Sequence, residues 1–206
     1  LAFLLILVSL LYKTHDDFDW YHLPYTLNIA QNKFQFGLGL FNLGFRTPSS
    51  LFYLNSLFYL PVIKFYSFNF AQLYIFLFGL IFFYKKIFNE DNKNSFVFLY
   101  SLLSFIFISV VFYRLAEHGT DRSGQILTFL VVIFIIEILN SKKLDINSIY
   151  IILIILVYLI TVKTYFIIFT FLFLPLLFKI KNDFKIYNKI IFSKITIFCI
   201  IFLIFH

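Results

Sequence analysis

The sequence has few of the residues on which soluble enzymes usually depend. It contains no methionine, one cysteine and only 13% charged residues, whereas about a quarter of the residues in a typical soluble domain are charged. Because Cys199 is the single cysteine, an intrachain disulfide and a cysteine-rich metal site are excluded. It lies in an apolar run. Because there is no initiator methionine and both ends of the chain are hydrophobic, we expect a fragment of a longer protein.

Several sequence motifs of well-known enzyme classes are also missing. There is no P-loop, no GxGxxG, no HExxH and no Ser-His-Asp set visible from the spacing. Nucleotide-driven transport and zinc proteolysis therefore have no support. The net charge of +7 does not indicate nucleic-acid binding, because the lysines are spread over polar segments between hydrophobic runs, where they orient helices in a bilayer.

What the chain does contain is apolar surface. Hydrophobic residues make up 62% of it and the mean hydropathy is +0.93, which predicts an all-α polytopic transmembrane bundle. The run 146–178 is too long for one crossing, because a helix of that length measures about 50 Å, so we divide it at 161–164. We expect about seven spans in one module, 1–206. They are the end of a first span at 1–12, then 66–84, 94–113, 125–139, two within 146–178, and a seventh from 195.

The lysines predict which side each loop faces. Ten of them fall in segments 85–93, 140–145 and 179–194, which share one side if 146–178 crosses twice. Lysine-rich short loops are typically cytoplasmic. The segments 13–65, 114–124 and the region around Lys163 are then outer loops of an integral protein of the bacterial cytoplasmic membrane.

The first outer loop, 13–65, carries internal helix signals. Pro24 is suited to the first turn of a helix, and the stretch Thr47–Ser50 precedes an apolar run, 51–60, as helix-start residues do. Pro61 is expected to break that second helix. We interpret both as helices lying at the membrane interface rather than as crossings, although 51–65 is apolar enough to leave a crossing open.

The first candidate site is the stretch from His15 to His22. Asp16 and Asp17 are adjacent carboxylates, which raise each other's proton affinity, so either is a candidate general base. Together with His15, Asp19 and His22, they are also suited to a divalent cation. The alternative is a solvated polar cap at the end of a span, with Asp19 capping the next helix.

A second polar cluster lies far downstream. It consists of Arg114, Glu117, His118, Asp121 and Arg122. Glu117 and Asp121 are four residues apart, so on a helical turn they share one face and form a second candidate site. The alternative is a tight polar turn with salt bridges. Two isolated cations, Lys163 and Arg46, are candidates for binding phosphate at the membrane surface, or else they extend to the interface as lysines and arginines often do. Glu137, near the lysine-bearing end of its span, is interpreted as structural.

The order of these features resembles the membrane glycosyltransferases of the GT-C superfamily. The closest likeness is to bacterial relatives of protein mannosyltransferases and lipid A aminoarabinose transferases. The matching stretches are Asp16–His22, Arg46–Tyr53, Arg114–Arg122 and Thr161–Thr164. The chain departs from the family pattern in having Asp-Asp where Asp-Glu is usual, and a single proline in Thr47–Ser50.

The resemblance implies a GT-C-like N-terminal module that transfers a sugar from a polyprenyl-phosphate donor to an acceptor outside the cytoplasmic membrane. Asp16 or Asp17 would be the general base, and Asp121 with Glu117 the second acidic group. The donor phosphate would be held by Lys163, Arg46 or Arg122. Candidate substrate or metal contacts are His15, Asp19, His22 and His118.

Membrane lipids and the lipid-linked donor are the expected partners, nucleic acid is not, and the acceptor is unspecified. The alternative is a non-catalytic membrane protein, which would be a transporter, a cell-envelope assembly component or an inactive relative. The enzyme hypothesis predicts that the two acidic clusters lie on one side and form one site. A transporter instead predicts charged residues near the middle of the spans.

Overall fold

The regular structure of the chain is helical. A computed structural model describes residues 17–33, 35, 37–46, 48–89, 95–111, 120–141, 144–181 and 184–206. Within these ranges no strand forms, and the nearest approach to one is an isolated bridge between Leu60 and Lys64. The prediction of an all-α fold is therefore confirmed.

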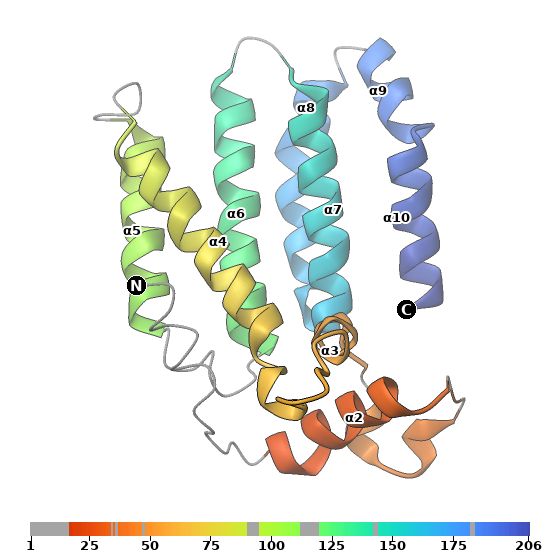
Figure 1. The fold of residues 1–206 in the computed structure, drawn as a ribbon. Coiled ribbons are helices and arrows are strands. Elements are labelled where there is room, and N and C mark those ends of the chain that lie inside the picture. Colours follow the sequence, from red (N-terminus) through yellow and green to blue (C-terminus); the bar gives the residue numbers. More distant parts are fainter. Residues whose placement is uncertain are drawn as a thin grey trace.

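Long helices form a bundle, and shorter pieces lie across one end of it (Figure 1). The bundle helices are α4 (Phe70–Ile87), α5 (Phe96–Val111), α6 (Thr120–Asn140), α7 (Ile146–Val162), η7 (Thr164–Phe173) with α8 (Leu174–Ile180), and α10 (Lys194–Phe205). The shorter pieces are η1 (Phe18–His22), α2 (Leu23–Gln31), η2 (Leu38–Leu40), η3 (Leu43–Arg46), α3 (Ser50–Ser56) and η4 (Phe65–Ser67). A further short helix, α9 (Phe184–Ile191), lies at the opposite end.

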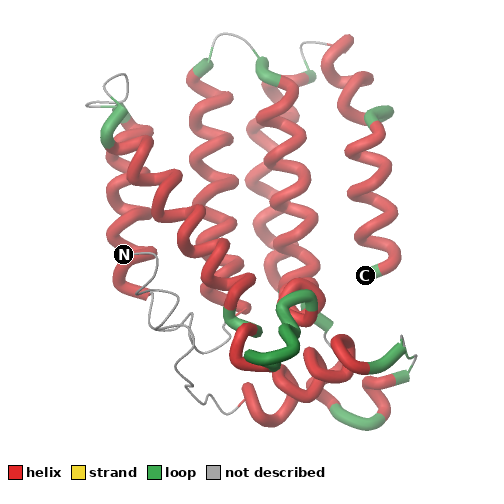
Figure 2. The backbone as a smooth tube through the Cα atoms, in the orientation of Figure 1, coloured by secondary structure: helices red, strands yellow, loops and turns green. Residues whose placement is uncertain are grey.

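Successive helices of the bundle run in opposite directions, and loops gather at its two ends (Figure 2). One end, here called the acidic end, carries Asp17, Asp19 and Asp121 with Lys163. The other, the lysine end, carries the described lysines of the segments predicted to be cytoplasmic, which are Lys85, Lys86, Lys179, Lys181, Lys189 and Lys194. The described lysines of these segments therefore lie at one end, as expected from the sequence, because 146–178 traverses the bundle twice.

Two helices are long and apolar enough to cross a membrane, namely Phe65–Ile87 and Thr120–Asn140. Shorter apolar helices cover 96–110, 146–162, 164–180 and 194–205. The predicted division at 161–164 is confirmed, since α7 ends at Val162, Lys163 is extended (φ −159°, ψ 128°) and η7 starts at Thr164. The extended residue turns the chain back along the bundle.

Helix α6 forms the centre of the bundle. Ile126, Leu130 and Ile133 on it are almost completely buried among residues of α4, α7 and η7. Two glycines allow this close packing. A Cβ on Gly79 would come within 2.7 Å of Ile126, and one on Gly124 within 2.2 Å of the Phe166 ring.

Three predicted boundaries need correction. The segment 114–124 is not wholly a loop, because α6 already starts at Thr120, where the carboxylate of Asp121 interacts favourably with the helix dipole in the first turn. The segment 179–194 contains the helix α9. The helix predicted for 51–60 ends at Ser56, just before Leu57, whose carbonyl the ring of Pro61 would meet if the helix continued.

The crosswise segment at the acidic end is attached to the bundle by buried polar contacts. Ser49 caps α3 by accepting a hydrogen bond from the Leu51 amide at 3.3 Å, which confirms the predicted helix start. Thr161 at the end of α7 donates to Ser50 Oγ at 3.0 Å. Asn55 and Gln72 pair their side-chain amides, with Asn55 Nδ2 donating to Gln72 Oε1 at 2.9 Å. The position of α3 is therefore fixed by both α7 and α4.

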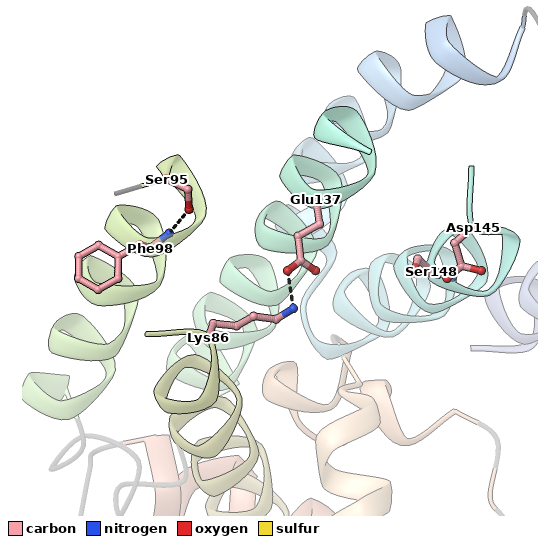
Figure 3. Close-up of polar contacts among 6 residues, drawn as sticks. All are labelled: Lys86, Ser95, Phe98, Glu137, Asp145 and Ser148. Atoms are coloured by element: carbon pink, nitrogen blue, oxygen red, sulfur yellow. Dashed lines mark hydrogen bonds and ion pairs between the residues drawn. The ribbon is translucent and has the colours of Figure 1, made fainter. Parts of the chain in front are cut away.

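Charged side chains at the lysine end stabilise helix ends. Lys86 of α4 forms an ion pair with Glu137 of α6 (Figure 3), which agrees with a structural role for Glu137. Lys179 donates to the carbonyl oxygens of Ile138, Leu139 and Ser141 at 2.5, 3.0 and 2.7 Å, and so caps the C-terminus of α6.

Candidate functional site

The acidic end begins with an irregular helical turn. Residues 18–22 form a π-helix in which the amide of Leu23 bonds to the carbonyl of Phe18, five residues back. Pro24, in the next turn, has no N–H to donate to the carbonyl of Trp20, four residues back. That carbonyl instead accepts a hydrogen bond from Asn42 Nδ2 at 3.0 Å. Such π-turns occur frequently at functional sites.

Tyr21 lies at the centre of the candidate site. Its ring packs directly on Gly44, where a Cβ would come within 2.4 Å of the ring. Burial raises the pKa of Tyr21 to about 12, supported by the charge of Asp17, by a hydrogen bond with Asp17 and, more weakly, by the charge of Asp121. The Tyr21 hydroxyl is therefore hydrogen-bonded to Asp17 and within electrostatic range of Asp121, a residue about a hundred positions further along the chain.

Asp121 connects this tyrosine to the break between α7 and η7. Its Oδ1 lies 2.6 Å from Lys163 Nζ, and the two side chains are 49% and 42% exposed. Lys163 Nζ also lies 5.5 Å from the ring centre of Tyr165, whose hydroxyl is close to Asp121. Arg122 acts electrostatically on the same tyrosine and donates to Gln125 Oε1 at 2.7 Å.

The structure therefore brings together four of the residues predicted for the site, Asp17, Asp121, Arg122 and Lys163. They come from the N-terminal segment, the first turn of α6 and the end of α7. Their charges are balanced, with two carboxylates and two cations. Because the Asp121–Lys163 pair is partly exposed, it contributes little to stability, and an incoming anion can compete for the lysine.

Three other predicted residues have different surroundings. His22 is buried in an aromatic cluster, with ring centres of Tyr21 and Phe52 at 4.3 and 4.9 Å, so its surroundings are those of a packing residue. Asp19 is exposed. Arg46 is exposed and donates its Nε–H to the carbonyl of Gly39 at 3.0 Å, which closes the η2–η3 turn.

Four predicted candidates, His15, Asp16, Glu117 and His118, lie outside the described residues. Among the residues that are described, no group of three or more His, Cys, Asp and Glu side chains is arranged to hold a metal ion.

The sequence analysis assigned no role to Tyr21, Tyr165 or Gly44. Tyr21 follows Asp17 by four residues, a spacing that places both on one helical face, so it was detectable in principle. Tyr165 follows Lys163 by two residues, but only the extended conformation of Lys163 brings the Tyr165 hydroxyl to Asp121. Gly44 acquires its role from a contact across 23 residues that no local pattern reveals.

Comparison with known proteins gives one finding. No curated protein and no solved structure matches the chain. A family model does match, over residues 1–206, and its family is described only as a domain of unknown function. The chain therefore belongs to the family of the domain of unknown function DUF8201.

Proposed function

We propose that this chain is the membrane core of a GT-C-type glycosyltransferase, which moves a sugar from a polyprenyl-phosphate donor to an acceptor on the outer face of the cytoplasmic membrane. The observation that carries the proposal is the ion pair between Lys163 and Asp121 at the same end of the bundle as Asp17, which is hydrogen-bonded to Tyr21. A general base and a phosphate-binding cation are the two groups that this reaction requires.

The surface of the chain supports a membrane location for this site. Large apolar side chains are exposed along the bundle, such as Phe78 at 56% and Ile204 at 72%. At the acidic end, Trp20, Leu40 and Phe41 are 75%, 85% and 86% exposed, as is typical of residues at the membrane interface. The described bundle helices carry their charged residues near the helix ends, which favours an interfacial site over a charged path through the membrane.

The proposed reaction uses the charges in the following way. The donor phosphate displaces Asp121 from Lys163 and lies between Lys163 and Arg122. Asp17 accepts the proton of the acceptor hydroxyl as its oxygen forms a bond to the anomeric carbon of the sugar. The bond between that carbon and the phosphate oxygen breaks, and the two cations stabilise the charge on the departing polyprenyl phosphate. The neutral Tyr21 hydroxyl holds Asp17 in place.

The direct test is sugar transfer from a labelled polyprenyl-phosphate sugar by the full-length protein in proteoliposomes. Asp17→Asn is expected to lower kcat by at least about 100-fold, the lower limit for loss of a general base. Asp19→Asn is the matched control, because Asp19 belongs to the same turn but is exposed, and its activity should stay within about twofold of wild type. Normal transfer by both Asp17→Asn and Asp16→Asn would exclude the general-base role.

A further inference from the structure

A cavity of about 350 Å³ lies between α7 and α10, away from the candidate site. It starts near Lys194, the first residue of α10, and ends near Phe202. Lys194 belongs to the lysine end, whereas Asp121 and Lys163 are at the other end (Figure 1). The walls are formed by Ile154, Val157, Tyr158, Ile195, Phe198, Cys199 and Phe202.

The wall contributed by α10 is one helical face. Residues 195, 198, 199 and 202 follow the spacing that places side chains on one side of a helix. Phe198 is 65% exposed and Ile154 is 47% exposed, so the cavity is a groove that opens toward the surroundings of the bundle. Its walls are almost entirely hydrocarbon, which makes it unsuitable for a polar ligand.

The dimensions of the groove indicate what occupies it. The eight residue steps from Lys194 to Phe202 correspond to about 12 Å of helix axis. A further helix, about 10–12 Å in diameter, is too wide to lie inside a cavity of about 350 Å³ and could only pack across its opening. A single hydrocarbon chain is narrow enough, and one leaflet of a bilayer core is about 15 Å deep.

The charge at the open end selects the type of lipid. Lys194 is exposed where the groove begins, and Lys181 and Lys189 lie at the same end of the bundle. Lysines near the membrane surface attract anionic head groups. We propose that this groove binds one acyl chain of an anionic glycerophospholipid, with the lipid phosphate beside Lys194. The site is independent of the proposed glycosyltransferase reaction.

The chain carries its own reporter for this binding. Cys199 is the only cysteine in the sequence, it lines the groove and it is 6% exposed. In detergent micelles, dioleoylphosphatidylglycerol is expected to slow the reaction of Cys199 with N-ethylmaleimide in the full chain. Dioleoylphosphatidylcholine at the same concentration should slow it less. Native mass spectrometry provides a second readout, as the number of phospholipids retained per chain.

Two pairs of variants decide the result. Lys194→Gln should weaken phosphatidylglycerol binding about fivefold, whereas Lys181→Gln, at the same end but outside the groove, should change it less than twofold. Val157→Phe fills the groove and should abolish retention of the lipid, whereas Ile151→Phe, on an exposed part of α7 outside the groove, should not.

Three outcomes would overturn the proposal. They are equal binding of the two phospholipids by the wild-type chain, unchanged retention in Val157→Phe, and protection of Cys199 by polyprenyl phosphate but not by phosphatidylglycerol. The mass-spectrometric count remains informative if Cys199 reacts too slowly in the lipid-free chain, because retention does not depend on the thiol.

Discussion

The two ends of the bundle use similar charged residues in different ways. At the lysine end, Lys179 caps the carbonyls of α6, and Lys86 pairs with Glu137 beside the same helix end. At the acidic end, Lys163 reaches Asp121 across 42 residues, and the pair is surrounded by tyrosine hydroxyls and irregular helical turns. The Asp121–Lys163 pair at the acidic end instead joins the first turn of α6 to the break between α7 and η7. Under the proposed function, the lysine end maintains the bundle and the acidic end carries the chemistry.

The largest expected effect distinguishes Lys163 from Lys86, two lysines whose ion pairs lie at opposite ends of the bundle. Under the proposed function, Lys163→Met removes a cation from the donor phosphate and should lower kcat/KM for sugar transfer about 100-fold, as loss of one charge-stabilising group typically does. Lys86→Met should leave kcat/KM within about twofold, because its partner Glu137 is at the opposite end. Steady-state transfer assays on both variants make the comparison, and equal losses would remove the functional distinction between the ends.

A smaller effect is expected from the glycine beneath Tyr21. Gly44→Ala places a methyl group within 2.4 Å of the ring and must displace Tyr21, at a cost of about 1–3 kcal/mol. Because Tyr21 positions Asp17 in our proposal, kcat should fall about tenfold while KM for the donor changes little. Gly79→Ala is the control, since it also crowds a neighbour, Ile126, but inside the bundle. It should lower thermal stability without a specific loss of kcat.

Two helix caps, one at each end of the bundle, are expected to contribute equally to stability and can therefore be compared directly. Ser49 caps α3 at the acidic end, and Asp145 caps α7 at the lysine end by accepting from the Asn147 and Ser148 amides at 3.1 Å. Figure 3 shows Asp145 beside Ser148. Replacing either by alanine should cost about 1 kcal/mol and lower Tm by about 2–4 °C. Only Ser49→Ala should also lower transfer activity, because α3 is bonded to the end of α7 next to Lys163. Equal activities at matched Tm would contradict this.

The sequence predicted helices well where a single physical rule determined them. Hydrophobic runs gave the bundle helices, Ser49 gave the start of α3, and the excessive length of 146–178 gave the break at Lys163. Boundaries failed where tertiary contacts or helix-end effects decided them, as at Thr120. The assignment to the GT-C superfamily and the sidedness of the loops are still predictions.

The candidate site was also predictable only in part, because some of its contacts depend on tertiary packing. Charge is visible in sequence, so Asp17, Asp121 and Lys163 were identified, and the parity of the spans put them at one end. Their uncharged neighbours were not identified, because the role of a tyrosine depends on which carboxylate it meets. The close approach of Tyr21 to Gly44, and of Tyr165 to Asp121, follows from the packing of distant segments.

The smallest expected effect is a pH dependence at the lysine end. Hydrogen bonds from the Ser148 side chain and the Asn147 amide hold the pKa of Asp145 below its ordinary value of 3.8. A carboxylate with a lowered pKa in the folded state stabilises the fold above its unfolded pKa, and this contribution is lost as the pH falls through the folded value. The Tm difference between wild type and Asp145→Asn should therefore be constant above about pH 5 and shrink below about pH 4. Because Asp145 is exposed, the difference should also be small, and a difference that grows on acidification would show that the carboxylate does not act as this cap.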